Sequence, residues 1–589
     1  MARSRGFDTS ALFQALKHSV VIWGADENPS QDHMQSRVMT SSRYDTHFHL
    51  ISEREKEFNG LFRTGAFSPL LLQHVFATFA LLIIPLVIRH RNFYHSRLLR
   101  YGFHAIITVL SLYTIREVRF LGPANGYAVG LITTWFYIWS STMLIANNVQ
   151  RDFKRIEKEP EEVTKNTREN DVSKQSDPPE AVNQCRTPSH SGQVVLKVYR
   201  WQPYPQQLSH RVDWVCDLIF NFRGPNWNWR LRSLPPLPEA VIRDTEDQAR
   251  SSKQRGTRLT DCKPSVRLQY AFRAFLRDYI ALDFLKLLLM RDPYFWGFVD
   301  NPLPPPWPFS ILAFSPALVR AYRLTASLAA VLFALDIITS LNPIFFLGLS
   351  LAFPSFSRSI THQPLDEAWL YPESFGSAAA VLDHGLIGTW NTWWHQLFRF
   401  GFSECSRFIS DLLLLPCNQK QGDNNNNDDN DKNHTSFYKS ARRILQVMLA
   451  FSLSGLVHAM GSYTTFADSR PWNAFLFFFI QGLGVLIQSF FEITVIPKVM
   501  PLISSSPPPR WLIRTTNLGL VISWFYFTGP LIADDFSRSG IWMFEPLPIS
   551  PLRGGLRLGV EEDRWFCWRG SWFERWSGDT WWHSGIRFT

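Results

Sequence analysis

The sequence predicts an all-α fold, a polytopic bundle of about seven to nine transmembrane helices. Hydrophobic residues make up 46% of the 589-residue chain and charged residues only 19%, which is below the roughly 25% that soluble domains contain. Aromatic residues reach 15%, with 48 Phe and 23 Trp, and such residues suit lipid-facing and interfacial positions. The apolar residues are gathered into long runs, which in lipid can satisfy their backbone groups as helices.

Polar or proline-rich segments separate the apolar runs. In chain order the runs are 67–88, 103–115, 127–146, 324–339, 343–353, 444–460, 475–495 and 512–532. The first is close to the roughly 20 residues that a spanning helix needs, and we expect it to act as an uncleaved signal anchor. Residues 267–290 mix apolar side chains with Arg, Asp and Lys. They predict a helix that lies at the interface or inside the bundle.

The formal net charge of +10 is spread along the flanks of the apolar runs. Basic residues follow the first run at 89–91 and the third run at 151–155. By the positive-inside rule these two ends face the cytosol, and the N-terminus is then lumenal. A nucleic-acid-binding protein would need a compact basic patch, so we expect no nucleic-acid partner.

Composition divides the chain into four parts. Residues 1–65 form a polar N-terminal segment, and 66–148 hold the first transmembrane helices. Residues 149–210 are predicted to be a flexible charged loop, because they contain too few apolar residues to form a core. Residues 211–589 form the main membrane region. Within it, the Asn/Asp-rich insert 417–436 is predicted to be disordered, and the Trp-rich tail 564–589 to cap the bundle at the interface.

A histidine lies deep in the run 444–460. His458 is about fifteen residues beyond Arg442 and Arg443, which corresponds to roughly 20 Å along a helix. An ionisable group at that depth is costly, so a functional role is the default hypothesis. A neutral imidazole is suited to act as a general base. The alternative is a histidine that forms a hydrogen bond between helices. Ser454 and Gly455, one turn earlier, would let another helix or a substrate approach closely.

A second histidine-containing stretch covers residues 390–399. As a helix it would place Asn391 and His395 on one face, one turn apart. His384 would lie near the same face, about three turns before His395, although packing is the favoured role for it. His395 could also be an interfacial residue among aromatics, and Asn391 could cap or bridge helices. Arg399 fits either a phosphate contact or a positive flank. The six cysteines show no zinc-ligand spacing, so we expect no metal site.

These stretches resemble motifs of the wax-synthase-like membrane-bound O-acyltransferases, in particular the fungal acetyltransferases that modify terpenoid and meroterpenoid secondary metabolites. Trp390, Trp394-His395-Gln396 and Arg399 are similar to the family's WHQ motif. Ser454-Gly455 followed by His458 is similar to its SG-x-x-H motif. Other family-like residues are Arg223, Gly224, Trp227, Trp369, Pro372, Phe375, Gly376, Ser377 and the closing Trp581-Trp582-His583-Ser584-Gly585. Thr389 and Ala459 depart from the family pattern.

The resemblance implies a multi-pass membrane enzyme of the endoplasmic reticulum that transfers an acyl group, with acetyl favoured, from acyl-CoA to a lipophilic alcohol. It implies the catalytic residues His458, His395 and Asn391. It implies substrate or coenzyme contacts from Trp390, Trp394, Gln396, Arg399 and Ser454. Acetyl-CoA would be a co-substrate, with no bound cofactor. The alternatives are a long-chain wax ester or sterol acyltransferase, and a proton-coupled transporter, for which internal repeats would be expected.

Overall fold

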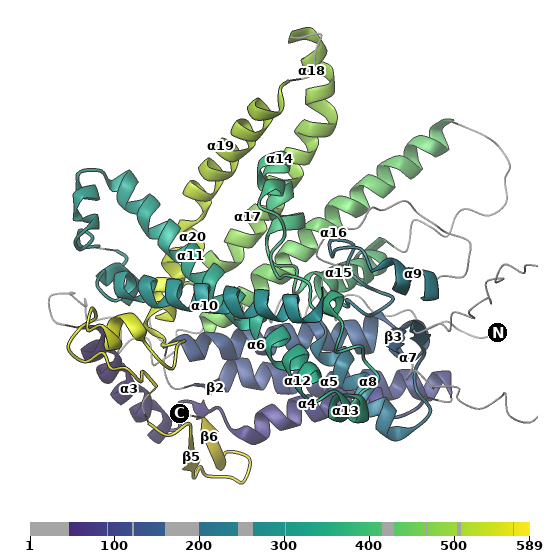
Figure 1. Ribbon diagram of the computed structural model, residues 1–589, viewed down its shortest axis with the longest axis horizontal. Coiled ribbons are helices and arrows are strands. Elements are labelled where there is room, and N and C mark those ends of the chain that lie inside the picture. Colours follow the sequence, from purple (N-terminus) through teal and green to yellow (C-terminus); the bar gives the residue numbers. More distant parts are fainter. Residues whose placement is uncertain are drawn as a thin grey trace, which may run out of the picture.

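The computed structural model describes residues 46–90, 92–120, 123–158, 199–245, 263–300, 302–414, 429–465, 469–503, 508–568 and 570–588. These residues are mostly helical (Figure 1). They also contain three two-stranded sheets. β1 (Ser68–Pro69) pairs in parallel with β2 (Val118–Arg119), while β3 (Arg155–Lys158) with β4 (Tyr199–Gln202) and β5 (Phe573–Trp576) with β6 (Gly585–Phe588) are antiparallel. The predicted helical bundle is confirmed, with these short sheets added at its edges.

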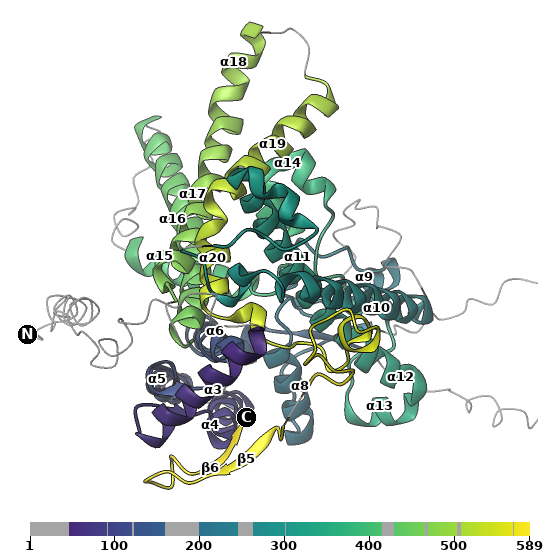
Figure 2. The same ribbon diagram turned by 90° about the vertical axis from the view of Figure 1, so that its left-hand side faces the viewer.

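The N-terminal helices form a layer at one side of the molecule, drawn in purple and blue in Figures 1 and 2. They are α3 (His47–Arg63), α4 (Leu72–Val87), α5 (Phe93–Glu117) and α6 (Pro123–Ser141), which continues as a π-helical turn, Thr142–Ala146. α4 packs on α5 and α5 packs on α6. The helices after them are α7 (Val149–Asp152), α8 (Leu208–Phe220), α9 (Glu239–Thr245) and α10 (Pro264–Leu289).

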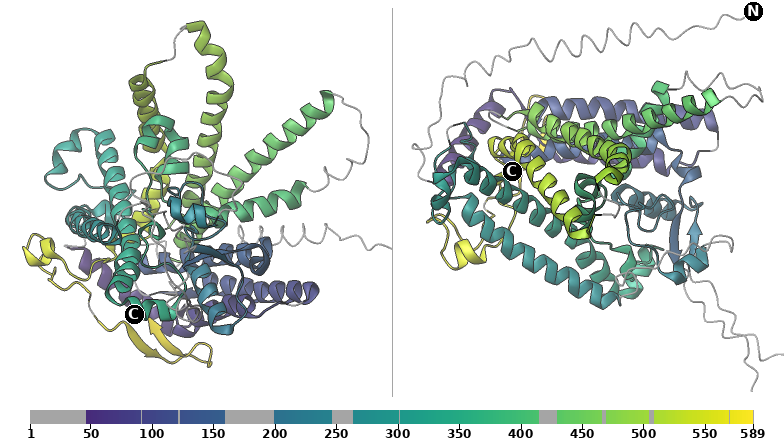
Figure 3. Two further views of the ribbon diagram at one scale, coloured as in Figure 1. Left: turned by 45° about the vertical axis from the view of Figure 1, so that its right-hand side comes forward. Right: turned by 90° about the horizontal axis from the view of Figure 1, so that it is seen from above.

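The second half of the chain supplies the remaining helices. They are α11 (Pro316–Asn342), α12 (Gly348–Ala352), α13 (Pro354–Ile360), α14 (Ala379–Gly388), α15 (Arg399–Leu414), α16 (Asp429–Tyr463), α17 (Pro471–Phe490), α18 (Ile496–Ile503), α19 (Arg510–Thr528) and α20 (Pro530–Arg538). α17, α18 and α19 project from the body of the molecule in Figures 1 and 3. α16 is central, because it packs against α17, α6 and α15.

Five helices in the described residues are long and apolar enough to cross a membrane. They are Tyr94–Glu117, Gly126–Ala146, Pro316–Ala352, Tyr438–Tyr463 and Pro471–Val499. The pair Arg510–Thr528 and Pro530–Arg538, bent by 42°, would make a sixth span. Large apolar side chains such as Val109, Ile493 and Phe527 are exposed on these helices, as lipid-facing residues are. These features indicate an integral membrane protein.

The predicted number of seven to nine spans is not confirmed, for two local reasons. The runs 324–339 and 343–353 belong to one continuous helix, because Pro343 is accommodated at the start of a π-helical turn, Pro343–Leu347. The run 67–88 becomes helical only from Leu72, since Ser68 and Pro69 form β1, and the 16 residues of α4 fall short of the usual spanning length.

The polar segments are more ordered at their edges than the sequence predicts. The loop 149–210 begins with α7 and β3 and ends with β4 and the start of α8, while 159–198 lie outside the described residues. Residues 417–428 of the Asn/Asp-rich insert also lie outside them, but its last residues belong to α16, which begins at Asp429. In the N-terminal segment, α3 occupies 47–63, and residues 1–45 are not described.

The C-terminal tail covers the N-terminal end of α4. The ring of Trp582 lies 4.7 Å from that of His74, and the side chain of Gln73 donates to the carbonyls of Trp582 and Ser584 at 3.1 and 2.7 Å. The tail therefore caps helices of the N-terminal layer, as a Trp-rich cap would.

The basic flanks after the first and third runs lie beside each other. The backbone N–H of His90 donates to Oε1 of Gln150 at 3.1 Å, and Nε2 of Gln150 donates to the carbonyls of Leu86 and Ile88 at 3.0 and 2.8 Å. At the other end of these helices, β1 before α4 pairs with β2 after α5. This arrangement agrees with the prediction that both basic flanks face one side of the membrane.

Candidate active site

His458 lies on α16, where α6, α17 and α20 meet. Its ring stacks on Phe478 of α17 with centroids 4.4 Å apart. Its Nδ1 lies 3.1 Å from the hydroxyl of Tyr127 on α6, and Phe536 of α20 lies 6.4 Å away. The imidazole is thus enclosed by aromatic rings on several sides and half-buried overall.

Small residues bring α6 and α17 close to α16. A methyl group on Gly130 would lie 2.0 Å from the carbonyl oxygen of Met460, and one on Gly461 would lie 2.7 Å from the ring of Tyr127. A methyl group on Gly455 would lie 2.8 Å from the carbonyl oxygen of Phe475. The sequence predicted that Gly455 allows either another helix or a substrate to approach closely. In the structure, helix α17 approaches it. The close packing sets the position of Tyr127 opposite His458.

Asp535 on α20 is a carboxylate near Tyr127. It lies close enough to Tyr127 to act on it electrostatically. Its Oδ1 accepts hydrogen bonds from Oγ of Ser462 at 2.9 Å and from the backbone N–H of Arg470 at 2.6 Å. Its Oδ2 is buried and has no hydrogen-bond partner among the described residues. This oxygen can still accept a hydrogen bond.

Sequence reasoning missed Tyr127 and Asp535, although a signal was present. Tyr127 opens the apolar run 127–146, and Asp535 closely follows the run 512–532. A buried carboxylate at the end of an apolar helix is a functional candidate on the same grounds as His458. What the sequence does not show is that α6 and α20 lie on either side of α16.

The prediction that residues 390–399 form a helix is wrong. α14 contains a break at Gly385, whose φ is +55°. Oε1 of Gln488 accepts the N–H groups of Leu386 and Ile387 at this break, at 2.8 and 3.3 Å. A π-helical turn follows at Thr389–Trp393, and Trp394 is extended. Asn391 and His395 therefore do not share a helix face.

The same break separates His384 from His395. His384 is exposed on α14 before Gly385, and its carbonyl accepts a hydrogen bond from Nε2 of Gln488 at 2.9 Å. The predicted alignment of the two histidines is wrong, because it assumed an unbroken helix between them.

Gln396 and Arg399 hold the irregular segment in place. Nε2 of Gln396 donates to the carbonyls of Trp390 and Trp394 at 3.0 and 2.6 Å. Nη1 of Arg399 donates to the carbonyl of Asn391 at 2.7 Å and to Oε1 of Gln396 at 2.8 Å. Nη2 of Arg399 also reaches Oδ1 of Asn391 at 3.3 Å. The two side chains replace the helical hydrogen bonds that this segment lacks.

His395 lies among the rings of Phe375, Trp394 and Phe398, with centroids 6.2, 5.1 and 5.8 Å from its own. Its Nδ1 is buried and has no hydrogen-bond partner within the described part of the chain. The pKa of His395 is lowered to about 3, mainly by burial and in smaller measure by the neighbouring His458 and Arg223. His395 is therefore neutral at physiological pH. It lies near enough to His458 for a charge on one ring to affect the pKa of the other.

Trp390 joins the two histidine motifs. Its ring lies 6.1 Å from Phe478, the ring on which His458 stacks, and 6.0 Å from Trp394. Ser454 is half-buried one turn before His458. Asn391 is exposed, and no hydrogen bond among the described residues joins it to either histidine. The structure thus brings His458, His395, Trp390 and Trp394 together, with Asn391 at their edge.

Other family-like residues support the segment that holds His395. Arg223 donates through Nη1 to the carbonyl of Glu373 at 2.5 Å and through Nη2 to that of Pro372 at 2.8 Å. The N–H of Gly376 donates to the carbonyl of Trp393 at 2.9 Å, and a methyl group on Gly376 would lie 2.1 Å from the carbonyl oxygen of Thr392. Only glycine allows this contact between the two segments.

Residues 371–480 match the model of a family described as membrane bound O-acyl transferase family. This region contains both histidines. The chain is also 28% identical over 171 residues to acetyltransferase eriL from Hericium erinaceus, and the alignment covers 28% of this chain and 37% of that protein. No solved structure matches the chain. Residues 371–480 are thus similar to membrane-bound O-acyltransferases, and the apolar helices agree with an integral membrane location.

Proposed function

We propose that this chain, whose matched region holds two neighbouring histidines, transfers an acetyl group from acetyl-CoA to a hydroxyl group of a lipophilic terpenoid or meroterpenoid. We place it in the endoplasmic reticulum membrane, with the basic flanks of α4 and α6 on the cytosolic side. The observation that supports the reaction most is the position of His458. Its ring is held inside the helix bundle by Tyr127 and Phe478, and it lies within electrostatic range of His395.

In the proposed reaction His458 is the general base. With Nδ1–H donating to the oxygen of Tyr127, Nε2 carries the lone pair that accepts the proton of the alcohol. The alcohol oxygen forms a bond to the thioester carbon, and a tetrahedral intermediate results. When the intermediate collapses, the C–S bond breaks and the CoA sulfur takes the proton from His458. The products are the ester and free CoA, and His458 is again neutral.

His395 and Asn391 are the candidates for stabilising the negative oxygen of that intermediate. His395 is neutral, and its buried Nδ1 has no partner among the described residues, so in the Nδ1–H tautomer it has a hydrogen bond to give. One such donor is typically worth about 3 kcal/mol in the transition state. The side-chain amide of Asn391 would supply a second donor from the edge of the site.

The remaining candidates would shape the site and bind the donor. Trp390 and Trp394 offer aromatic faces beside the histidines, and Ser454 lies one turn from His458. Gln396 and Arg399 keep the His395 segment in its irregular conformation. The guanidinium of Arg399 is held by carbonyl and amide oxygens and forms no ion pair in the described residues. Its charge is therefore available for a phosphate of CoA.

The preference for acetyl rests on the resemblance described above and on the name of the matched relative, an acetyltransferase. The test uses membranes that contain the full chain, supplied with labelled acetyl-CoA or longer acyl-CoAs and a panel of hydroxylated terpenoids and sterols. His458→Ala should lower kcat by about 100-fold or more, as loss of a general base does. His384→Ala, which changes an exposed histidine outside the site, should retain activity.

Equal product from wild type and His458→Ala would refute the proposed base. Faster transfer of long acyl chains than of acetyl by the wild-type protein would refute the acetyl donor and leave an O-acyltransferase of different chain-length specificity.

A further inference from the structure

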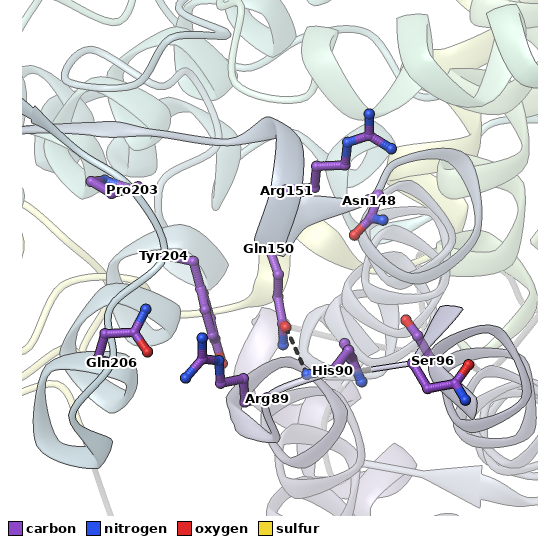
Figure 4. Close-up of a pocket in the computed structure, with 10 residues that line it drawn as sticks. Arg89, His90, Ser96, Asn148, Gln150, Arg151, Pro203, Tyr204 and Gln206 are labelled. Carbon is purple, nitrogen blue, oxygen red and sulfur yellow. Dashed lines mark hydrogen bonds between the residues drawn. The ribbon is translucent and has the colours of Figure 1, made fainter. Parts of the chain in front are cut away.

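A separate polar cavity lies where α4 ends and α5 begins, outside the candidate active site (Figure 4). Its volume is about 420 Å³. Its lining includes Arg89, His90, Gln150, Arg151 and Tyr204. They come from the α4–α5 junction, from α7 and from the segment before α8, so three parts of the chain build this cavity.

The carbonyl groups in the last turn of α4 already accept hydrogen bonds from protein side chains. Gln150 donates to the carbonyls of Leu86 and Ile88 at 3.0 and 2.8 Å, and the hydroxyl of Tyr204 lies 2.8 Å from the carbonyls of Leu86 and Val87. Arg211 also donates to the carbonyl of Val87 at 2.8 Å. Because these acceptors are already satisfied, the partial negative charge of the helix end is countered.

The cavity is positively charged. The residues that line it include Arg89 and Arg151 and no carboxylate. Arg89 is exposed and forms no hydrogen bond or ion pair within the described residues. Arg151 meets only its neighbour Asp152, at 3.9 Å with both side chains largely exposed, a weak pair. Nε2 of His90 is buried without a hydrogen-bond partner in the described part of the chain. The guanidinium groups of Arg89 and Arg151 fit an anion that has several oxygens.

Apolar side chains are exposed on the two helices that meet at this cavity. Ile84 and Ile88 at the end of α4 are 43% and 44% exposed, and Leu98 near the start of α5 is 74% exposed. The candidate span Tyr94–Glu117 begins at the same place. A ligand with both a phosphate and acyl chains would therefore meet cations at one end and apolar side chains at the other. A soluble coenzyme would have no use for the exposed apolar residues.

We propose that this cavity binds the phosphate of an anionic membrane lipid, with phosphatidate as the simplest ligand. The phosphate oxygens accept hydrogen bonds from Arg89 and Arg151, and the acyl chains lie along the exposed residues of α4 and α5. The site depends on neither His458 nor His395, so it stands apart from the transferase reaction.

The experiment measures the thermal unfolding midpoint of the full chain in a neutral detergent with added lipid. Phosphatidate should raise the midpoint of the wild-type protein, while diacylglycerol with the same acyl chains should not. The double variant Arg89→Gln/Arg151→Gln should lose this shift, with affinity lower by about ten-fold for each charged hydrogen bond removed. Arg116→Gln, an exposed arginine at the other end of α5, should keep it.

Three outcomes would overturn the proposal. They are equal stabilisation by phosphatidate and diacylglycerol, full retention of the phosphatidate shift in the double variant, and a shift produced by CoA that the double variant loses. The same measurement on His458→Ala separates this site from the reaction, because the lipid shift should persist in a protein that has lost transferase activity. Loss of the lipid shift in that variant would also contradict an independent site.

Discussion

The hydroxyl of Tyr127 lies 3.1 Å from Nδ1 of His458, although 331 residues separate them in the chain. The contact ties α6, which lies in the N-terminal layer, to α16, which carries the base. A partner on Nδ1 fixes the ring orientation and determines which nitrogen is left to accept a proton. Asp535 on α20 lies close enough to Tyr127 to influence it electrostatically, although no hydrogen bond among the described residues joins the two side chains.

Tyr127→Phe should lower kcat about five- to ten-fold with little change in KM, because one neutral hydrogen bond is worth about 1 kcal/mol. The aromatic packing against His458 and Phe536 would remain. The measurement is steady-state kinetics on membranes containing equal amounts of protein. Tyr137→Phe, on the same helix and stacked on His104, is the control. A kcat unchanged by Tyr127→Phe would show that the phenol does not position the base.

His395 should make the fold sensitive to acid. Its pKa in the folded protein is about 3, lowered from 6.5, so above pH 6.5 both the folded and the unfolded states hold it neutral. As the pH falls from 6.5 towards 3, the unfolded state binds a proton that the folded state does not. The free energy of unfolding then decreases by about 1.4 kcal/mol per pH unit from this group.

The measurement is the thermal unfolding midpoint in detergent between pH 7.5 and about pH 4.5, a window that spans most of this titration. His395→Gln should be less sensitive to acid than the wild-type protein, because the neutral amide does not titrate. His384→Gln, at an exposed histidine outside the site, is the matched control. Parallel curves for wild type and His395→Gln would mean that the ring is protonated in the folded protein.

The sequence predicted the helical membrane class and most of the helices, because long apolar runs in lipid have few alternatives to a helix. It also singled out His458 and His395, since ionisable groups in apolar surroundings are unusual. It did not predict the conformation around His395. There a contact between Gly385 and Gln488, from segments about a hundred residues apart, overrides the local helical pattern.

Long-range contacts also explain the residues that the sequence did not reveal. Tyr127 and Asp535 belong to helices far apart in the chain, and only the packing of α6 and α20 around α16 brings them to His458. The number of spans depended on local geometry as well. Pro343 reads as a break in the sequence, yet the structure accommodates it within one long helix.

Gly130→Ala should destabilise the protein and lower its activity. The added methyl group would lie 2.0 Å from the carbonyl oxygen of Met460 and 2.5 Å from Oγ1 of Thr464, and backbone atoms of a packed helix cannot give way cheaply. Overpacking of this kind typically costs about 1–3 kcal/mol. Because α6 also carries Tyr127, a shift of this helix away from α16 would disturb the contact with His458.

Gly102→Ala provides the matched control for this substitution. A methyl group on Gly102 meets nothing within 4 Å, so the change should be neutral or should stabilise α5 by up to about 1 kcal/mol. Thermal unfolding midpoints and transferase activity of the two variants test the prediction. If Gly130→Ala matched Gly102→Ala in both measurements, the close contact between α6 and α16 would be wrong.

Arg553→Met should be among the most destabilising changes in the C-terminal segment. The guanidinium is buried and bonds Oδ1 of Asp283 at 2.9 Å and both oxygens of Glu545 at 2.7 and 2.9 Å. Without it, the fully buried carboxylate of Asp283 on α10 would lose the cation with which it is paired. Breaking a buried pair from one side typically costs about 3–5 kcal/mol.

Arg510→Met is the control, because Arg510 is exposed and its partner Asp383 keeps Arg514, so the loss should be at most about 1 kcal/mol. The two variants are compared by their thermal unfolding midpoints in detergent, and equal midpoints would show that Arg553 does not anchor the C-terminal segment to α10.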